Sequence, residues 1–340
     1  MENVLEKPPL TTRIHIKVLE EFLIDTLLSL GLKEETAAIT AEVLIAGDKK
    51  GYHSHGVARI FQIEEGINNS TINPNANIDI TMDWPAIAVF DANYGIGQWS
   101  GKKAMEYAIR KAKQQGVGAV GVINASHLGI LGYYSELASK EGCIGIVMST
   151  SSPAVVIKGG KVKTFGTNPI SYSIPNTAFP ITADFSTSKV SRGKIYEYLH
   201  SAKKLPEGWA VTQEGLLTTS PEEALKGGLL TIDGDIKGCL LSLLISILCG
   251  SLIGGVINPK VTGTRYMNEK PNKGDFFIVL DVNKFTNYDL FLHQMIELDN
   301  FITAQNVDFR LPGKRSSLYS LIQEEYINIP DSVYEFIKSN

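Results

Sequence analysis

This chain of 340 residues contains few cysteines, has no excess of basic residues and shows no clear targeting signal. The three cysteines, Cys143, Cys239 and Cys249, do not have zinc-site spacing, and their odd number is typical of reduced cytosolic thiols. The 32 lysines and arginines are outnumbered by 36 acidic residues, which leaves a formal net charge of −4. This balance provides no basic field for nucleic acid or an anionic membrane. We therefore expect a small-molecule partner.

Export and membrane signals are also weak. The first residues, MENVLEKPPLTTR, contain no apolar signal core and no arginine-rich transit pattern, so we expect a cytoplasmic protein. One uncharged run, residues 239–257, approaches the length of about 20 apolar residues that spans a bilayer. Serines and glycines interrupt this run, and it ends at Asn258-Pro259. We interpret it as a buried helix in a large core rather than a membrane span.

Helical and extended patterns are interleaved along the rest of the chain, which indicates an α/β core. Strands are predicted at 86–90, 118–124, 144–149, 170–174 and 276–281. Helices are predicted at 18–30, from about 35 to 50, and at 101–115, 133–141, 189–204, 287–304 and 332–338. A Pro- and Asn-rich connector at 68–78 suggests a boundary. We predict a helical lobe from residues 1–75 with 285–340, and an α/β cofactor- and substrate-binding domain at 76–284.

Residues 116–121, Gly-Val-Gly-Ala-Val-Gly, match the dinucleotide fingerprint G-x-G-x-x-G. That motif works when a strand precedes it and a helix follows, because the pyrophosphate then meets the helix N-terminus. Here a lysine-rich helix precedes it and a strand follows. We therefore interpret Gly116 as a helix stop and predict no Rossmann loop at this place.

The first cluster of reactive side chains is Gly51-Tyr-His-Ser-His-Gly56, with Arg59 three residues further on. If the following segment is helical, His55 and Arg59 share a face. A guanidinium beside an imidazole suits a substrate with a carboxylate and a nearby oxygen to protonate. The alternative is a helix-capping histidine and a surface arginine. A metal site at His53 and His55 lacks a third ligand, so we predict no metal.

The second cluster is Asn124-Ala-Ser-His127-Leu-Gly-Ile-Leu-Gly132. His127 follows a predicted strand and precedes a predicted helix, where α/β folds commonly expose functional groups. A neutral histidine there can accept the proton of a hydroxyl as hydride leaves, and return it during reduction. The alternative is a histidine with a structural role.

Three further segments have polar or glycine-rich character that suits ligand binding. They are the loop 159–169, the stretch Asp184-Phe-Ser-Thr-Ser188 with Gly193-Lys194, and Lys237-Gly238. Each also has a structural interpretation. The loop is compatible with an ordinary turn, Asp184 with a cap for the helix at 189–204, and Lys237 with a solvated helix start.

Taken together and in order, these segments resemble the malate/L-lactate dehydrogenase family, which lacks a Rossmann fold. The motifs that carry the resemblance cover nearly the whole chain: SHG-x-x-R (54–59), N-x-x-H-x-G-x-x-G-Y (124–133), GG (159–160), GTNP (166–169), D-x-STS (184–188), GK (193–194), KG (237–238) and PG (312–313). The resemblance implies an α/β fold whose largely antiparallel mixed sheet is flanked by helices. A helical lobe would be formed from both chain termini, and two chains would form a homodimer.

The resemblance also implies roles for individual residues. His127 corresponds to the proposed general acid/base, and Arg59 is suited to hold the substrate carboxylate. Ser54 and His55 complete the polar cluster at the substrate. The residues implied to hold the nicotinamide cofactor, NAD or NADP with NAD favoured, are Ser151, Asp184, Phe185, Ser186, Lys237, Gly238, Gly313, Lys314 and Arg315.

The implied reaction is hydride transfer between nicotinamide and a small 2-hydroxy acid, with malate and oxaloacetate as the first expectation. Ureidoglycolate or a cyclic imine is the alternative substrate. The sequence departs from the family pattern after Lys237-Gly238, where Cys239 and Leu240 replace the usual tyrosine and glycine. A ligand-binding relative without catalysis is therefore a further alternative.

Overall fold

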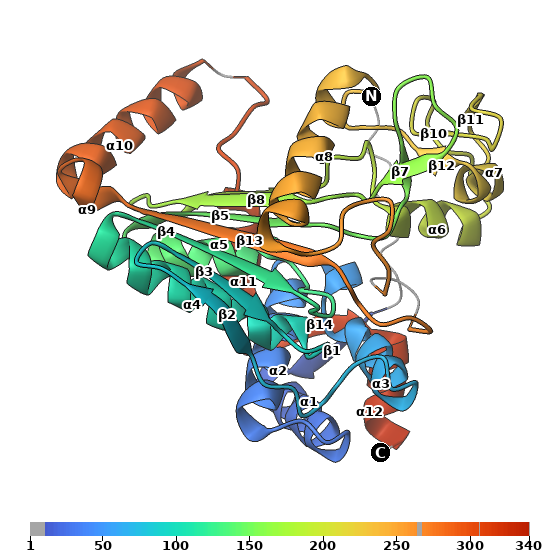
Figure 1. Cartoon of the computed structure of the whole chain (residues 1–340), viewed down its shortest axis with the longest axis horizontal. Coiled ribbons are helices and arrows are strands. Elements are labelled where there is room, and N and C mark those ends of the chain that lie inside the picture. The colour runs from blue at the N-terminus through green and yellow to red at the C-terminus, as the bar shows by residue number, and fades with distance from the viewer. Residues whose placement is uncertain (1–10, 264–266, 306, 340) are drawn as a thin grey trace.

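The computed structural model describes residues 11–263, 267–305 and 307–339. A seven-stranded sheet occupies its centre (Figure 1). In sheet order the strands are β2 (Asp79–Asp83), β3 (Ile87–Asp91), β4 (Val117–Ile123), β13 (Gly274–Asp281), β5 (Cys143–Ser149), β8 (Ile170–Ile174) and β9 (Ile181–Phe185). Strands β3 and β4 run parallel, and the other neighbouring pairs are antiparallel. The prediction of a largely antiparallel, non-Rossmann mixed sheet is confirmed.

Two helices, α4 (Gly97–Gln115) and α5 (Leu131–Lys140), pack against this sheet (Figure 1). Helix α4 ends at Gly116, whose φ of 89° is readily adopted only by glycine, and β4 begins at the next residue. The G-x-G-x-x-G match is therefore a helix stop followed by a strand, as predicted. No helix begins at these glycines.

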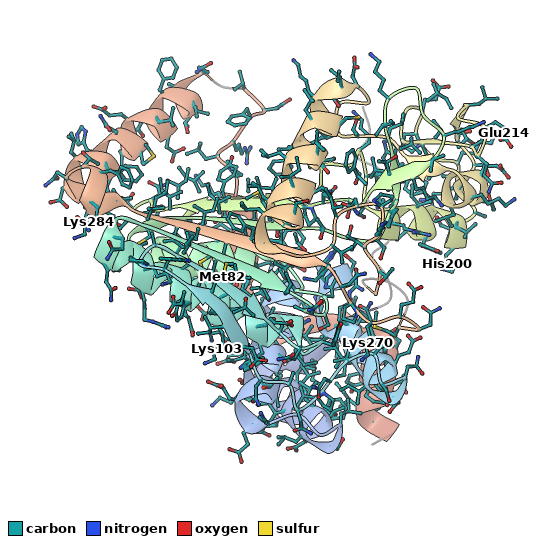
Figure 2. All side chains as sticks on the ribbon, viewed as in Figure 1. Met82, Lys103, His200, Glu214, Lys270 and Lys284 are labelled. Atoms are coloured by element: carbon teal, nitrogen blue, oxygen red, sulfur yellow. The ribbon has the colours of Figure 1, made fainter. Side chains whose placement is uncertain are left out.

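Both ends of the described chain meet in one helical lobe (Figure 1). It contains α1 (Ile16–Ser29), α2 (Glu34–Lys49), α3 (Ile60–Asn68) and α12 (Asp331–Ser339). It also contains an antiparallel strand pair that was not predicted, β1 (Thr11–His15) with β14 (Tyr326–Pro330). Lys103 of α4 lies at the edge of the lobe (Figure 2), where its ammonium pairs with Glu35 of α2 at 2.5 Å. The proposed limits of the two domains remain a prediction.

A smaller unit with its own apolar core lies beside the main sheet. Its five strands are, in order, β11 (Leu217–Thr218), β10 (Ala210–Val211), β12 (Gly228–Leu229), β6 (Val155–Val156) and β7 (Lys163–Phe165). Helices α6 (Arg192–His200) and α7 (Pro221–Lys226) belong to it. Figure 2 shows His200 and Glu214 on its outer side. The helix predicted at 189–204 is shorter, because Ser191 caps it by accepting the N–H of Lys194 at 3.2 Å.

The first part of the uncharged run lies in helix α8 (Ile236–Leu248). This helix is buried along one face only, whereas the sequence suggested a buried core helix. Its small residues Ser242 and Ser246 are fully buried, whereas Leu240 and Leu244 are 58% and 50% exposed. Residues 236–253 are apolar and long enough to suggest a membrane span by composition alone. The α-helix ends at Leu248, however, and its 13 residues extend about 20 Å, short of the roughly 30 Å hydrocarbon core.

The chain then continues through α9 (Val282–Phe285), α10 (Tyr288–Ala304) and α11 (Lys314–Ile322). Helix α10 stands apart from the sheet (Figure 1), and none of its 17 described residues is buried. Apolar side chains such as Leu290 and Phe301 are nevertheless present on it, 53% and 67% exposed. Helices α8 and α10 thus both present apolar surface that the described residues do not cover.

Candidate active site

A cavity of about 310 Å³ lies between the helical lobe, the main sheet and the start of α6. Its volume is in the range of small-molecule sites. It brings together eight of the residues predicted from the sequence: Ser54, His55, Arg59, His127, Ser151, Asp184, Phe185 and Ser186. Segments that are up to 132 residues apart in the chain (Ser54 to Ser186) therefore converge on one site.

The cavity lining formed by the described residues does not include the other five predicted residues. The backbone N–H groups of Lys237 and Gly238 both donate to the Asp233 carboxylate at 3.1 Å, so these residues form the capped start of α8. Gly313, Lys314 and Arg315 open α11. Their segment lies along β9, because the carbonyl of Pro312 accepts the Thr182 N–H at 3.1 Å.

The segment that carries the first histidine cluster is fixed by a buried carboxylate. Asp48 accepts the backbone N–H of Val57 at 2.6 Å and pairs with Nδ1 of His53 at 2.6 Å. A Cβ at Gly56 would lie 2.0 Å from Asp48 Oδ2, so this close approach requires glycine. His53 therefore has a structural partner. Among the described residues, no group of three His, Cys, Asp or Glu side chains is placed to hold a metal.

Arg59 and His55 both face the cavity from two short 3-10 turns, η1 (His53–His55) and η2 (Val57–Arg59), rather than from one α-helix. Nε of Arg59 donates to the Ser54 carbonyl at 2.8 Å, and its Nη1 donates to Gln62 at 2.6 Å. These bonds orient the guanidinium. Burial, aided by the charge of Arg59, lowers the pKa of His55 to about 4, so His55 is neutral at pH 7.

His127 occupies the loop between β4 and α5. This loop is held against α4, since Ser126 Oγ accepts the Gly97 N–H at 2.8 Å. Nδ1 of His127 accepts the Gly129 N–H at 2.9 Å, and the ring centroid lies 5.3 Å from that of His55. Burial, followed by the charge of Arg59, holds the pKa of His127 well below its usual range. The ring is therefore neutral and, with Nδ1 accepting, carries its proton on Nε2.

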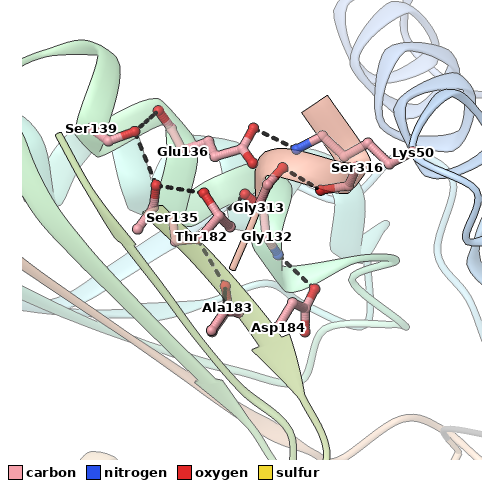
Figure 3. Close-up of polar contacts among 12 residues, drawn as sticks. Lys50, Gly132, Ser135, Glu136, Ser139, Thr182, Ala183, Asp184, Gly313 and Ser316 are labelled. Carbon is pink, nitrogen blue, oxygen red and sulfur yellow. Dashed lines mark hydrogen bonds and ion pairs between the residues drawn. The ribbon is translucent and has the colours of Figure 1, made fainter. Parts of the chain in front are cut away.

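Asp184 lies near the end of β9 and caps a helix, although not the helix that the sequence suggested. Its Oδ2 accepts the backbone N–H of Gly132 at the start of α5, at 2.8 Å (Figure 3). Ser191 caps α6 instead. Burial raises the pKa of Asp184 to about 6. Further along α5, Glu136 forms an ion pair with Lys50, which connects this helix to the helical lobe (Figure 3).

Another part of the cavity lining combines an apolar ring, a cation and a helix N-terminus. Phe185 is 38% exposed, and Arg192 and Gly193 at the start of α6 line the same cavity. Ser151 Oγ accepts the Thr167 N–H at 3.0 Å, which joins the predicted GTNP loop to this wall. A helix N-terminus with an arginine suits phosphate, and an apolar ring suits a planar heterocycle. These residues fit a dinucleotide.

Sequence reasoning missed Lys273, which is 2% exposed and lines the cavity together with Ser149. Its ammonium pairs with Asp275, and Asp275 in turn accepts Ser149 Oγ at 2.6 Å. The signal in the sequence was present but small: a lysine and an aspartate two residues apart, at the entry to the apolar strand FFIVLD. Such spacing places both side chains on one face of a strand.

Comparison with known proteins places this arrangement in a family. Residues 14–338 match the family described as malate/L-lactate dehydrogenase. The chain is 40% identical to a malate/(S)-sulfolactate dehydrogenase of Methanothermus fervidus, over 87% of each chain. It is 31% identical to an NAD(+) ureidoglycolate dehydrogenase of Escherichia coli, over 96% of this chain and 95% of that one. The solved sulfolactate dehydrogenase of Methanocaldococcus jannaschii superposes with a TM-score of 0.89 at 37% identity, covering 96% of both chains.

Proposed function

The chain belongs to the malate/L-lactate dehydrogenase family of oxidoreductases, and from this premise we propose that it interconverts malate and oxaloacetate with a nicotinamide cofactor. The observation that carries the proposal is the placement of Arg59 and a neutral His127 in one cavity. A 2-hydroxy acid presents a carboxylate and an adjacent oxygen, which are the two groups that such a pair recognises. The M. fervidus relative, whose name includes malate, supports this substrate class.

Arg59 is proposed to bind the carboxylate on C1, since its guanidinium can form a charge-assisted, bidentate contact. His127 is proposed to donate a hydrogen bond from Nε2 to the oxygen on C2. His55 and Ser54, joined by a 2.8 Å bond between Nδ1 and Oγ, close the same side of the cavity. When bound, the nicotinamide supplies the hydride for C2 or accepts it.

Ser151, Asp184, Phe185 and Ser186 are proposed to contact the cofactor from the cavity wall. Lys237, Gly238 and the segment Gly313–Arg315 are proposed as outer contacts, since the described cavity lining does not include them. NAD is favoured over NADP, in keeping with the cofactor named for the E. coli relative. The three free cysteines agree with a reducing cytoplasm, where we propose that the protein works.

Ureidoglycolate is the second candidate substrate, because it too is a 2-hydroxy acid and the E. coli relative is named for it. The sequence motifs also leave a cyclic imine as an alternative substrate, which is less similar to malate than ureidoglycolate is. A relative without catalysis is disfavoured by the site itself. The departures at Cys239 and Leu240 lie on α8, whereas Arg59 and His127 are both present in the cavity.

The direct test follows oxidation of NADH and NADPH at 340 nm while oxaloacetate, pyruvate and other 2-oxo acids are offered in parallel. We expect turnover of oxaloacetate that exceeds that of pyruvate, with NADH the better cofactor. Cofactor binding by fluorescence titration serves as the control for a folded site. Binding without turnover of any 2-oxo acid would refute the proposed substrate class and favour an imine or a non-catalytic role.

We also propose that two copies form a homodimer through the apolar faces of α8 and α10. Exposed apolar surface on a helix face often marks an interface. A Leu240→Glu/Leu244→Glu double variant should therefore sediment at half the mass of the parent protein. Leu216→Glu, at a residue that is 68% exposed in the small unit, is the matched control. An unchanged mass in the double variant would exclude α8 from the interface.

A further inference from the structure

Lys273 is a charged residue buried in the wall of the proposed active site. Its backbone carbonyl accepts the N–H of Asn124 at 3.2 Å, which fixes it beside the loop that carries His127. Burying an ammonium is unfavourable unless a partner compensates for the lost water. A lysine retained at such a place, inside a cavity that also holds Arg59, is a candidate for function.

The partner of Lys273 is the carboxylate of Asp275. Asp275 follows two residues later on the same strand face and is fully buried, and its carboxylate pairs with the lysine ammonium. Ser149, directly opposite Asp275 in the register of β5 and β13, donates to the same carboxylate at 2.6 Å. Lys273 lines the cavity, whereas the described lining does not include Asp275. Lys273 is therefore a residue of the cavity wall whose ammonium pairs with a carboxylate outside the described lining.

The hydrogen bond at Nδ1 limits what His127 itself does. Gly129 donates its N–H to that nitrogen at 2.9 Å, so the neutral ring has its single proton on Nε2. This Nε2–H can donate to an oxygen of the substrate, but it has no lone pair with which to take up a hydroxyl proton. This tautomer therefore does not suit the general acid/base role that the resemblance implied for His127, and the reaction needs another group to exchange that proton.

We propose that Lys273 is a further catalytic residue, which exchanges the proton with the C2 oxygen while Nε2–H of His127 donates a hydrogen bond to the same oxygen. This inference rests on the proposed function. Lys273 and His127 line one cavity, and the lysine charge is among the causes that lower the pKa of His127. Asp275 is a positioning residue that orients the lysine side chain through their ion pair.

The proposed step balances in both directions. During reduction C2 receives the hydride, and the C=O π electrons move onto oxygen. That oxygen takes a proton from the ammonium, so one N–H bond breaks and one O–H bond forms. The resulting amine regains its proton from water. Oxidation reverses each of these changes, and the amine then takes the hydroxyl proton as hydride leaves C2.

The test compares three variants with the wild-type enzyme in the oxaloacetate assay. Lys273→Met removes the proton donor, and Lys273→Arg keeps the cation but not a readily released proton. We expect both to lower kcat by about 10²–10⁴ with unchanged NADH affinity. Because Lys273→Met leaves Asp275 buried without its partner, Lys273→Met/Asp275→Asn provides a folded comparison, verified by circular dichroism and thermal unfolding.

A second readout separates proton transfer from support of the fold. In Lys273→Ala, added methylamine and less basic primary amines should restore part of kcat, with a rate that depends on the pKa of the amine. Full activity in Lys273→Arg or in the double variant, or no dependence on amine pKa, would overturn the inference alone. A wild-type enzyme that reduces no 2-oxo acid would instead overturn the proposed function, and this inference with it.

Discussion

Replacing His127 with alanine is expected to lower kcat for oxo acid reduction by about 10²–10³, the usual loss when one donor to a developing oxyanion is removed. The structure gives the reason, since Nδ1 of His127 is engaged by Gly129 at 2.9 Å and Nε2–H remains as the donor. Cofactor affinity should not change, because His127 is not among the residues proposed to contact the cofactor. Stopped-flow or steady-state rates at saturating NADH measure the effect.

His127→Gln is the informative partner variant. Its amide reaches about as far as Nε2 and keeps an N–H donor, so it should recover part of the activity that alanine loses. A histidine that carried the proton itself would leave the glutamine variant as slow as the alanine variant. Equal rates in the two variants would therefore refute the donor role.

The pH dependence gives a further check on the same residue. Burial and Arg59 hold the pKa of His127 well below its usual range, so the neutral donor persists as pH falls through 6.5. Protonation at lower pH would place a proton on Nδ1, facing the Gly129 N–H, and activity should then fall. A rate limb near pH 6.5 that vanishes in His127→Gln would contradict this assignment.

Most of the main sheet was predictable because its signals are local, although strands β2 and β9 were not predicted. Strand β13 alternates buried and half-buried residues through Phe276–Asp281, and Gly116 marks the end of α4 in the sequence itself. The reversed order of helix, glycines and strand was sufficient to exclude a Rossmann loop. Part of the cavity lining was likewise found, because His55, Arg59 and His127 lie in compact motifs.

Other features depend on contacts between distant segments. Thr11 pairs with Pro330, and no local pattern in either strand indicates its partner. Asp184 precedes α6 in the chain but caps α5, since the fold brings Gly132 to its carboxylate. The run at 239–257 is as apolar as a core helix. Its burial on one face only depends on how the whole chain packs, which the local sequence does not show.

Lys273 shows most clearly why the site was only partly predictable. A lysine and an aspartate around Gly274 read as a polar strand entry, because nothing in the sequence announces that both are buried. The proposed role of this pair becomes apparent only in the folded chain, where β5 places Ser149 beside Asp275 and the 124–130 loop brings His127 to the same cavity. Resemblance to a family finds motifs, whereas the physical cost of a buried charge appears only in three dimensions.

Arg59→Met is expected to lower kcat/KM for oxaloacetate by about 10²–10⁴, since a substrate carboxylate buried without its cation loses roughly 3–5 kcal/mol. The kcat/KM of Arg59→Lys should lie between those of the wild-type enzyme and Arg59→Met, because an ammonium keeps the charge but not the planar pair of donors. Arg59 also donates to the Ser54 carbonyl at 2.8 Å and to Gln62 at 2.6 Å. Loosening of the 53–59 segment is therefore a competing explanation for a loss of rate.

Two comparisons separate carboxylate binding from loop support. Gln62→Ala removes one of those internal bonds while leaving the guanidinium, and it should retain most of the activity. The wild-type enzyme should react slowly with a substrate whose C1 carboxylate is replaced by an amide. Arg59→Met should turn over this amide at about the same rate as the wild-type enzyme does. The preference for acid over amide would then collapse in the variant. If Arg59→Met kept that preference while losing rate on both, Arg59 would be a support for the loop, and the carboxylate would have to be bound elsewhere in the cavity.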